Sequence, residues 1–420
     1  MNQKIIAAQF LNLGAFLQNQ FLPELLSRFK QHNIIQSYIE TATIFCYSWA
    51  IWLNPNLAEA HYKLGRLFQK QKKWQEAATA YEESTKIGDF KLAEAYYHLG
   101  RMLLIQEQFE ESIDALEQAI KLEPEQSWYY RTLGDILSKK GELAKGIKNY
   151  QIASQKQIIK THPHVVLNTK KEQHLSPPNF IIIGQAKCGT SSLYDYLTQH
   201  PQILPAIKKE IKFWNVKFNF DKGLDWYLAH FPAISSEESF ITGEATPAYL
   251  DFRKAAVPLF QEFPSMKLIV LLRNPVDRAI SHYYMRVREH SDNRSVEKVI
   301  LSGVEVITTK SDVNSYNYCN ISLYIKRSQY IESLSQWMDI FPKNQFLILK
   351  SEDFFADPAT TLNQVFQFLG VEPYQLQEYR KINKGSYPPI SESMRQILSD
   401  YFRPFNQQLE EYLDQKFNWN

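Results

Sequence analysis

The stretch Asn179–Leu197, NFIIIGQAKCGTSSLYDYL, changes its periodicity and its chemistry within a few residues. Residues 180–183, FIII, form an apolar and β-branched run with the length of a buried strand. Further on, Leu193, Tyr196 and Leu197 recur at helical spacing. The stretch therefore predicts a strand, a loop and a helix, in that order.

The loop between these elements has the features of a phosphate-binding site. Gly184 and Gly189 allow the backbone to approach a ligand closely. The amides at the start of the helix, together with its dipole, favour an anion. Lys187 adds a full positive charge. Hydroxyl donors follow at Thr190, Ser191 and Ser192. The alternative is a glycine turn that serves strand–helix packing and binds no ligand.

The loop differs from the P-loop of nucleotide triphosphatases at the metal-binding position. In a P-loop, Lys and then Ser or Thr follow the last glycine, so that the hydroxyl binds Mg²⁺. Here Thr190 follows Gly189, and Lys187 stands inside the loop. This variant resembles the 5′-phosphosulfate loop of sulfotransferases, which use 3′-phosphoadenosine 5′-phosphosulfate (PAPS) and no metal. The resemblance implies a donor site at Lys187, Cys188, Gly189, Thr190, Ser191 and Ser192.

Length and composition restrict the class of protein. A chain of 420 residues is too long for one ordinary core and favours two domains. A net charge of +2 gives no global field for nucleic acid, so we expect none as a partner. Cys46, Cys188 and Cys319 are far apart, which argues against a disulfide framework and a zinc site. No segment reaches membrane-spanning length. We predict a soluble, cytoplasmic protein.

The first half of the chain contains an internal repeat. The dipeptide Leu-Gly recurs at Leu64-Gly65, Leu99-Gly100 and Leu133-Gly134, with spacings of 35 and 34 residues. That period is typical of tetratricopeptide repeats, and residues 56–157 resemble three of them. The resemblance implies an α-helical superhelix whose concave surface binds a protein partner. Self-association, or a purely structural role, is the alternative.

The domain boundaries follow from these patterns. We expect the repeat domain to cover residues 1–158, with a degenerate repeat and a capping helix before the three clear repeats. The polar, proline-marked residues 159–177 are predicted to be a linker. Residues 178–420 then form the second domain, for which the resemblance implies an α/β, P-loop-like sulfotransferase fold with a central parallel sheet.

A charged segment follows the loop helix, in which lysines and aromatic residues flank Glu210. By itself, such a run is typical of a solvated surface. After a phosphosulfate-type loop, Lys208-Lys209-Glu210 resembles the Lys-Lys-Glu motif of heparan-type sulfotransferases and their bacterial relatives. There the glutamate is the catalytic base, so the resemblance implies that Glu210 removes the acceptor proton. Should Glu210 fail this role, His200, His230 and His282 are the next candidates.

A second strand signal, residues 267–272, ends in Arg273-Asn274-Pro275. Asn274 is predicted to cap the next helix, with Pro275 in its first turn. Arg273 would then stand at the carboxyl edge of the sheet, where such folds bind ligands. Ser281 follows Arg273 by eight residues, a pairing that resembles the 3′-phosphate site of sulfotransferases. The alternative is a salt-bridged arginine and an ordinary helical serine.

Three further segments carry weaker signals. Residues 243–250, GEATPAYL, resemble a sulfotransferase block that lines the acceptor cleft, although Ala245 replaces the lysine of many carbohydrate-specific relatives. Residues 288–321 are polar and irregular, and they are a candidate acceptor lid. Lys384 and Gly385 resemble the late Lys-Gly loop that returns to the nucleotide.

Together these signals predict a sulfotransferase that transfers a sulfonate group from PAPS to a hydroxyl or amine of a carbohydrate or another small molecule. Glu210 and Lys187 are its predicted catalytic residues. A P-loop nucleotide kinase or triphosphatase is one rival, but it would need magnesium and an acidic residue where Arg273 stands. A catalytically inactive binding module with a repeat domain is the other. It would show losses among the key residues, whereas all are present.

Overall fold

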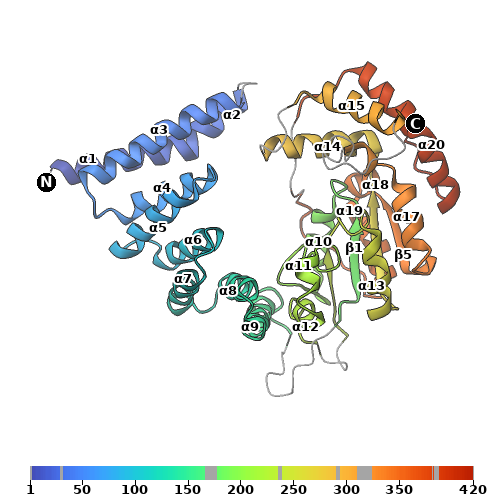
Figure 1. Cartoon of the computed structure of the whole chain (residues 1–420), viewed down its shortest axis with the longest axis horizontal. Helices are drawn as coiled ribbons and strands as arrows, with labels where there is room; N and C mark the ends of the chain where they lie inside the picture. Colours follow the sequence, from blue (N-terminus) through green and yellow to red (C-terminus); the bar gives the residue numbers. More distant parts are fainter. Residues whose placement is uncertain are drawn as a thin grey trace. The chain divides into compact units, whose positions relative to one another are not determined.

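The computed structural model describes residues 2–28, 32–165, 177–234, 239–289, 294–309, 324–380, 382 and 387–419. The chain divides into two compact units, Met1–Gln157 and Ile158–Asn420. Both are drawn in Figure 1, and each is described by itself below.

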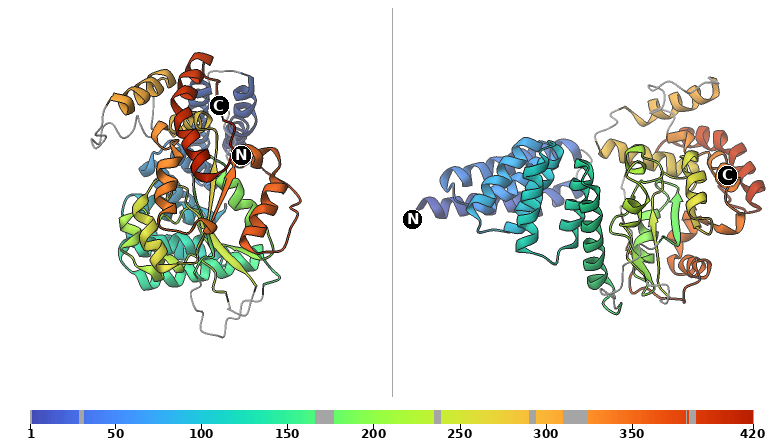
Figure 2. Two further views of the ribbon diagram at one scale, coloured as in Figure 1. Left: turned by 90° about the vertical axis from the view of Figure 1, so that its right-hand side faces the viewer. Right: turned by 60° about the horizontal axis from the view of Figure 1, so that its bottom comes forward.

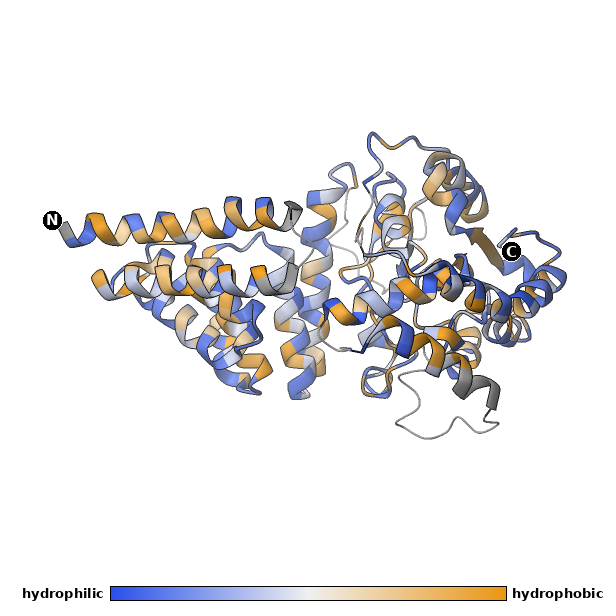
Figure 3. Cartoon of the chain, turned by 90° about the horizontal axis from the view of Figure 1, so that it is seen from above, coloured by the Kyte–Doolittle hydropathy of each residue, from blue (hydrophilic) through white to orange (hydrophobic). Residues whose placement is uncertain are grey.

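The first unit is helical throughout its described residues. Its elements are α1 (Asn2–Phe16), the π-helical turn η1 (Leu17–Phe21), α2 (Leu22–Arg28), α3 (His32–Leu53), α4 (Ala58–Lys70), α5 (Trp74–Ile87), α6 (Leu92–Ile105), α7 (Phe109–Leu122), α8 (Ser127–Lys140) and α9 (Leu143–Thr161). Figure 3 shows hydrophilic and hydrophobic residues alternating along these helices, as expected of amphipathic helices. The predicted helix pairs are confirmed as α4/α5, α6/α7 and α8/α9.

Close contact inside each pair depends on the repeated glycine. A Cβ at Gly65 would lie 2.9 Å from the Tyr81 ring, and one at Gly134 would lie 2.5 Å from the Tyr150 ring. The aromatic ring of the second helix therefore occupies the space that a side chain on the first would need. Gly14 of α1 meets Tyr47 of α3 in the same way, at 2.5 Å. Gly14 therefore gives α1 and α3 the same close approach as the helix pairs of the three clear repeats.

The second unit is an α/β domain. Its strands are β1 (Phe180–Gly184), β2 (Ile203–Pro205), β3 (Ile241–Ala245), β4 (Lys267–Leu272) and β5 (Phe346–Lys350). Its helices are α10 (Thr190–Leu197), α11 (Lys217–Phe220), α12 (Leu224–Leu228), η2 (Arg253–Ala255), α13 (Ala256–Glu262), α14 (Pro275–Arg288), α15 (Val296–Thr309), α17 (Tyr330–Met338), η3 (Lys343–Gln345), α18 (Ser351–Ala356), α19 (Pro358–Leu369) and α20 (Glu392–Leu413).

The five strands form one parallel sheet in the order β2-β3-β1-β4-β5. All five residues of β1 are buried, which explains its uninterrupted apolar sequence. β1 pairs with β3 on one side and with β4 on the other. The chain first builds the β2–β3 side and then crosses to β4. The carboxyl end of β1 is therefore a topological switch point, where open parallel sheets bind ligands.

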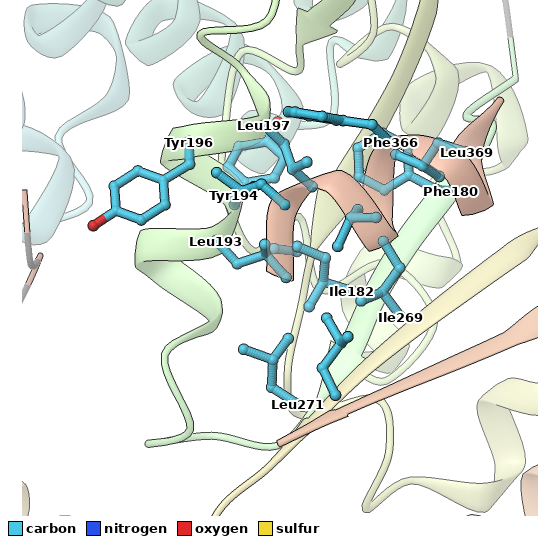
Figure 4. Close-up of a cluster of buried hydrophobic side chains, with 14 of the residues drawn as sticks. Phe180, Ile182, Leu193, Tyr194, Tyr196, Leu197, Ile269, Leu271, Phe366 and Leu369 are labelled. Atoms are coloured by element: carbon cyan, nitrogen blue, oxygen red, sulfur yellow. The ribbon is translucent and has the colours of Figure 1, made fainter. Parts of the chain in front are cut away.

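Helices cover both faces of this sheet (Figures 1 and 2). On one face, side chains of α10 and α19 meet those of β1 and β4, as Figure 4 shows. The labelled members of this core are Phe180, Ile182, Leu193, Tyr194, Tyr196, Leu197, Ile269, Leu271, Phe366 and Leu369. In Figure 1, α13 and α17 lie on the opposite side of the sheet. The core thus fixes β1, β4 and α10, the three elements that border the predicted phosphate loop.

Two segments differ from the sequence-based expectation. α9 continues to Thr161, and Ile158 and Val165 pack against Leu204 of β2. The start of the predicted linker is therefore packed, because its apolar residues find partners in the second unit. Within the candidate lid, residues 296–309 form α15 rather than an irregular segment. Residues 310–321 of that candidate lie outside the described part of the chain.

Candidate active site

The loop after β1 brings a positive charge to the switch point. Gly189 precedes α10 and has φ of 96°, a left-handed conformation that favours glycine. A Cβ there would also lie 2.9 Å from the Phe355 ring. Lys187 has φ of 76°, so the loop turns sharply on both sides of Cys188. The predicted strand, loop and helix are confirmed, and the amides that begin α10 are directed toward the loop.

Neighbouring side chains hold the loop through the peptide groups of Ala186. The Gln185 side-chain carbonyl accepts a hydrogen bond from the Ala186 amide at 2.6 Å, and its amide group donates to Asp251 at 2.6 Å. Arg278 is fully buried and donates from Nε to the Ala186 carbonyl at 3.2 Å. Arg278 also donates to the carbonyl of Tyr324. The sequence indicated the loop and a role for Arg278 in fixing its helix to the sheet, but not these hydrogen-bond partners, which join segments distant in the sequence.

Lys187 lies in a positively charged environment. Burial lowers the pKa of the Lys187 ammonium, and the neighbouring Arg288, Arg273 and Arg278 lower it further, whereas Glu289 acts in the opposite direction. Arg273 donates from a guanidinium nitrogen to the Lys187 carbonyl at 3.4 Å. Four cationic side chains from the loop and from β4 and α14 thus converge. Such a concentration of charge favours a polyanionic ligand.

The hydroxyl residues of α10 differ in their surroundings. Thr190 and Ser192 are buried, and Ser191 is half-buried. Ser192 Oγ accepts a hydrogen bond from the Ile382 amide at 3.1 Å. The chain near residue 382 therefore returns to the loop helix. Lys384 and Gly385, the two predicted donor contacts that follow, lie outside the described residues.

Cys188 is packed rather than directed at a ligand. Its side chain is fully buried in the core beside the sheet, and burial raises the pKa of the thiol to about 11. Its amide donates to the Gln185 carbonyl at 3.1 Å, and its carbonyl accepts from Ser351 Oγ at 2.7 Å. These contacts use its backbone groups within the protein, so the structure gives no support to Cys188 as a donor contact.

β4 and α14 have the predicted local structure. The Asn274 side chain caps α14 by accepting hydrogen bonds from the amides of Val276 at 3.0 Å and Asp277 at 3.4 Å. Arg273 is half-buried at the end of β4, and its carbonyl accepts from the Tyr330 hydroxyl at 2.8 Å. Ser281 is buried two turns into α14. The cap and the edge position of Arg273 are confirmed, whereas the pairing of Arg273 with Ser281 stays a prediction.

Glu210 lies between two lysines on an irregular segment. Lys209 Nζ is 3.2 Å from one carboxylate oxygen, and Lys212 Nζ is 3.4 Å from the other. The Glu210 amide donates to the Ala245 carbonyl at 3.1 Å, which joins the segment to the end of β3. The Glu210 side chain is 37% exposed, so an acceptor could reach the carboxylate.

The three histidines that were the alternative bases are engaged elsewhere. His200 Nε2 is 2.8 Å from the Glu372 carbonyl, and His230 Nδ1 is 2.9 Å from the Trp226 carbonyl. Burial and the adjacent Arg278 lower the pKa of His282 to about 2. All three histidines are buried, and each has a ring nitrogen within hydrogen-bond distance of another group of the protein. Glu210, which is partly exposed, therefore remains the best candidate for the base among the described residues.

Glu244 was not singled out from the sequence, although it lies in the block at 243–250. Its side chain is fully buried at the end of β3 and accepts four hydrogen bonds. Burial raises the pKa of the Glu244 carboxyl, whereas these donors act in the opposite direction. Neither Gly243 before it nor Tyr249 five residues after it distinguishes, in the sequence, a buried hydrogen-bond acceptor from a surface acid.

The described residues lack both a metal-binding cluster and a membrane-spanning helix. They contain no group of three or more His, Cys, Asp or Glu side chains placed to hold a metal ion. In the same part of the chain, no helix combines the length and the apolar composition needed to cross a bilayer.

Comparison with known proteins places this site in a family. Residues 177–394 match the model of the sulfotransferase domain, which covers more than half of the chain. Residues 58–88 and 93–126 match tetratricopeptide repeat models. The chain therefore belongs to the sulfotransferase family, with tetratricopeptide repeats in its N-terminal part.

Three individual relatives each match a little more than half of this chain. The membrane-associated sulfotransferase kil1 of Dictyostelium discoideum is 27% identical over 314 residues, covering 58% of this chain and 66% of that protein. Human bifunctional heparan sulfate N-deacetylase/N-sulfotransferase 3 is 31% identical over 264 residues, covering 56% of this chain but 30% of its own length. A solved sulfotransferase from Alicyclobacillus acidocaldarius is 27% identical with a TM-score of 0.49, covering 58% of this chain and 99% of that one.

Proposed function

We propose that this protein transfers a sulfonate group from PAPS to a hydroxyl or amine of an acceptor, and that it needs no metal. One observation supports this most strongly: Lys187 and Arg273 follow two adjacent parallel strands, and the Glu210 segment is joined to the end of a third. An anion site and an accessible carboxylate thus share one edge of the sheet. That arrangement suits the transfer of an anionic group to a nucleophile that must lose a proton.

The residues present fit a donor with several phosphate charges, because four cationic side chains gather around the loop. Lys187, the first amides of α10, Thr190 and Ser191 would hold the 5′ end of the nucleotide. Arg273 and Ser281 would hold its 3′-phosphate, and Ser192, Lys384 and Gly385 complete the proposed site. When bound, PAPS supplies a sulfonate on a 5′-phosphate leaving group.

In the proposed reaction, Glu210 accepts the proton of the acceptor as its oxygen or nitrogen forms a bond to sulfur. Lys209 and Lys212 form ion pairs with the two oxygens of the Glu210 carboxylate. As the bond between sulfur and the phosphate oxygen breaks, Lys187 and the α10 amides stabilise the negative charge that grows on the leaving phosphate.

The acceptor is proposed to be a carbohydrate or another small molecule. Heparan sulfate N-sulfotransferases are among the relatives, which supports testing an amino sugar first. Ala245 stands where the resemblance to carbohydrate-specific sulfotransferases implies a lysine, so a neutral acceptor is the next to test. The repeat unit is proposed to bind a protein partner or a second copy of the chain. Cys46 and Cys188 are buried free thiols, which suits the reducing cytoplasm we propose.

The test is transfer of labelled sulfonate from PAPS in excess chelator. The acceptors would be an amino-sugar oligosaccharide with free amines, a neutral oligosaccharide and 2-naphthol. We expect a labelled product from at least one of them, because Lys187 and backbone dipoles supply the charge that a metal provides in a kinase. A strict requirement for Mg²⁺, or phosphate transfer from ATP, would support the kinase alternative instead. Tight donor binding without transfer to any acceptor would support the inactive module.

A further inference from the structure

The backbone around Glu210 has an unusual conformation. Glu210 has φ of 61° and Lys212 has φ of 57°, so two residues with side chains occupy the left-handed region within three positions. That region is disfavoured for residues other than glycine and persists only where surrounding contacts impose it. The conformation directs the Glu210 carboxylate, so whatever imposes it also positions the proposed base.

Glu244 supplies the first of these contacts. One of its carboxylate oxygens, Oε2, accepts hydrogen bonds from the Ile211 amide at 3.4 Å and from Thr246 Oγ1 at 2.6 Å. Ile211 lies between the two left-handed residues. The other oxygen, Oε1, accepts from the hydroxyls of Tyr227 at 3.0 Å and Tyr249 at 3.1 Å.

Tyr249 extends this contact along the segment. Its hydroxyl donates its single proton to Glu244, so its oxygen can accept from the amides of Phe213 at 3.0 Å and Trp214 at 3.5 Å. Together with the bond from the Glu210 amide to the Ala245 carbonyl, four amides of residues 210–214 are held by the end of β3 and its tyrosine. Apart from the Glu210 amide, which donates to the Ala245 carbonyl, each donor in this network points to Glu244 or to Tyr249, whose own proton goes to Glu244.

Because the hydrogen bonds at Glu244 all need a carboxylate oxygen as acceptor, the network is sensitive to the loss of one such oxygen. A glutamine at position 244 would present an NH₂ group in place of one oxygen. If the NH₂ faced Ile211, that amide would lose its acceptor. If it faced the tyrosines, Tyr249 would have to accept from it and turn its own proton toward the Phe213 amide. In either orientation, a buried amide of the Glu210 segment is left without a partner.

We infer that Glu244 is a positioning residue, which holds the Glu210 segment in its left-handed conformation and thereby acts on the transfer step without touching donor or acceptor. The inference rests on the proposed function, because it assumes that Glu210 is the base. It assigns to Tyr249 the role of transmitting the effect of Glu244 to Phe213 and Trp214. Tyr227 donates to the same carboxylate oxygen and contacts the segment through the side chains of Phe213 and Trp214, but among the described residues it accepts no backbone amide of the segment.

The experiment uses the full chain and two measurements. One is sulfonate transfer from PAPS to whichever test acceptor the wild-type protein uses, and the other is binding of 3′-phosphoadenosine 5′-phosphate (PAP). We expect Glu244→Gln to lower kcat about 10- to 100-fold, because small displacements of a reacting group have effects of that size. PAP affinity should stay within about twofold, since the phosphate loop is untouched. In a Glu210→Gln background, Glu244→Gln should cause no further loss of turnover, because its effect passes through Glu210.

Two tyrosine variants provide a matched pair that does not depend on Glu244→Gln folding. Tyr249→Phe and Tyr227→Phe each remove one donor from the same buried oxygen, but only the first removes an acceptor of the segment's amides. Tyr249→Phe should lower kcat and speed hydrogen exchange at Phe213, whereas Tyr227→Phe should do neither. Equal effects of the two variants, or additive losses in the double variant with Glu210→Gln, would overturn the inference. If wild-type protein transfers nothing, or if Glu210→Gln alone keeps full turnover, the proposed function or its base fails instead.

Discussion

At the level of single residues, Glu210 and Arg273 are assigned separate tasks that substitution can distinguish. Glu210→Gln keeps the shape of the side chain but removes its basic oxygen, and a general base contributes roughly 10²- to 10⁴-fold in rate. We expect saturating turnover to fall by that order while PAP affinity, measured by calorimetry, changes little. Glu262→Gln, at an exposed glutamate of α13, is the control. Near-normal turnover of Glu210→Gln would place the base elsewhere.

Arg273→Ala should have the opposite signature. The substitution removes a charged contact with the nucleotide, worth about 1.5 to 3 kcal/mol as a charge-assisted hydrogen bond. PAP affinity should therefore fall about 10- to 100-fold, with a smaller effect on turnover at saturating donor. The same calorimetric titration measures this loss. Unchanged PAP affinity would mean that Arg273 supports the Lys187 carbonyl alone and does not bind the 3′-phosphate.

His282 gives the second unit a pH-dependent stability. Its folded-state pKa is about 2, so it stays neutral in the folded protein, whereas the unfolded chain binds a proton below its ordinary pKa of 6.5. The stability is therefore present above pH 6.5 and is lost as the pH falls toward 2. Each such group contributes a slope of at most about 1.4 kcal/mol per pH unit.

His282→Asn should make this slope shallower, because asparagine can still accept from Arg278 but takes up no proton. Hydrogen exchange of α14 peptides between pH 6.5 and 5 measures the local free energy of opening. The difference between variant and wild type at pH 8 isolates any loss of packing. Parallel curves for the two proteins below pH 6.5 would show that His282 does not cause the acid sensitivity.

The charged residues of the proposed donor site were identified from the sequence, whereas the hydrogen bonds that position the site were not. Lys187 lies in a recognisable glycine loop. Arg273 lies between a buried strand and the cap of the next helix. Local sequence patterns therefore locate both residues. Gln185, Arg278 and Glu244 act through hydrogen bonds to segments far away in the sequence. Their partners depend on strand order, which periodicity does not reveal. Cys188 was assigned to the donor by its place in the loop; its side chain is buried, and its contact with the donor stays a prediction.

At the level of secondary structure elements, the helix pairs of the repeat unit depend on close approach at glycine. A Cβ at Gly100 of α6 would overlap the Leu116 side chain and lie 3.0 Å from the Ser112 carbonyl of α7. Gly100→Ala should therefore destabilise the repeat unit by roughly 1 to 3 kcal/mol, as overpacking does. Glu117→Ala, at an exposed position of α7, should not.

Hydrogen exchange of the α6 and α7 peptides would measure this destabilisation, and PAP affinity should be unaffected by either variant. Equal protection of these helices in Gly100→Ala and wild type would show that α6 and α7 can separate at no cost. The prediction depends on the repeat period alone, which is why the sequence revealed these elements. α15 was missed although Val296, Ile300 and Val304 recur at helical spacing, because the interpretation of residues 288–321 rested on the polar residues on both sides of α15.

At the level of the whole molecule, the second unit begins before the family motif does. Ile158 and Val165 pack against Leu204, and His162 Nε2 lies 3.3 Å from the His200 carbonyl. A fragment of residues 158–420 should therefore bind PAP as tightly as the full chain. A fragment of residues 177–420 should be less stable by about 3 kcal/mol, because burial of one aliphatic side chain contributes roughly 1.5 to 3 kcal/mol.

Chemical unfolding of the two fragments, followed by calorimetry with PAP, makes this comparison. Equal stability of the two fragments would mean that residues 158–165 contribute nothing to the catalytic fold. If the longer fragment cannot bind PAP while the full chain does, the repeats are part of the catalytic fold, and the predicted boundaries at 158 and 178 are wrong.

The hydrogen bond from the Ile382 amide to Ser192 links positions separated by 190 residues. During synthesis at about 5 to 20 residues per second, Ser192 emerges roughly 10 to 40 s before its partner. For that time, the nascent chain carries the phosphate loop without this contact. A translation product that stops before residue 382 therefore contains the loop but never completes it. The proposed donor site is in this way tied to synthesis of the chain through residue 382.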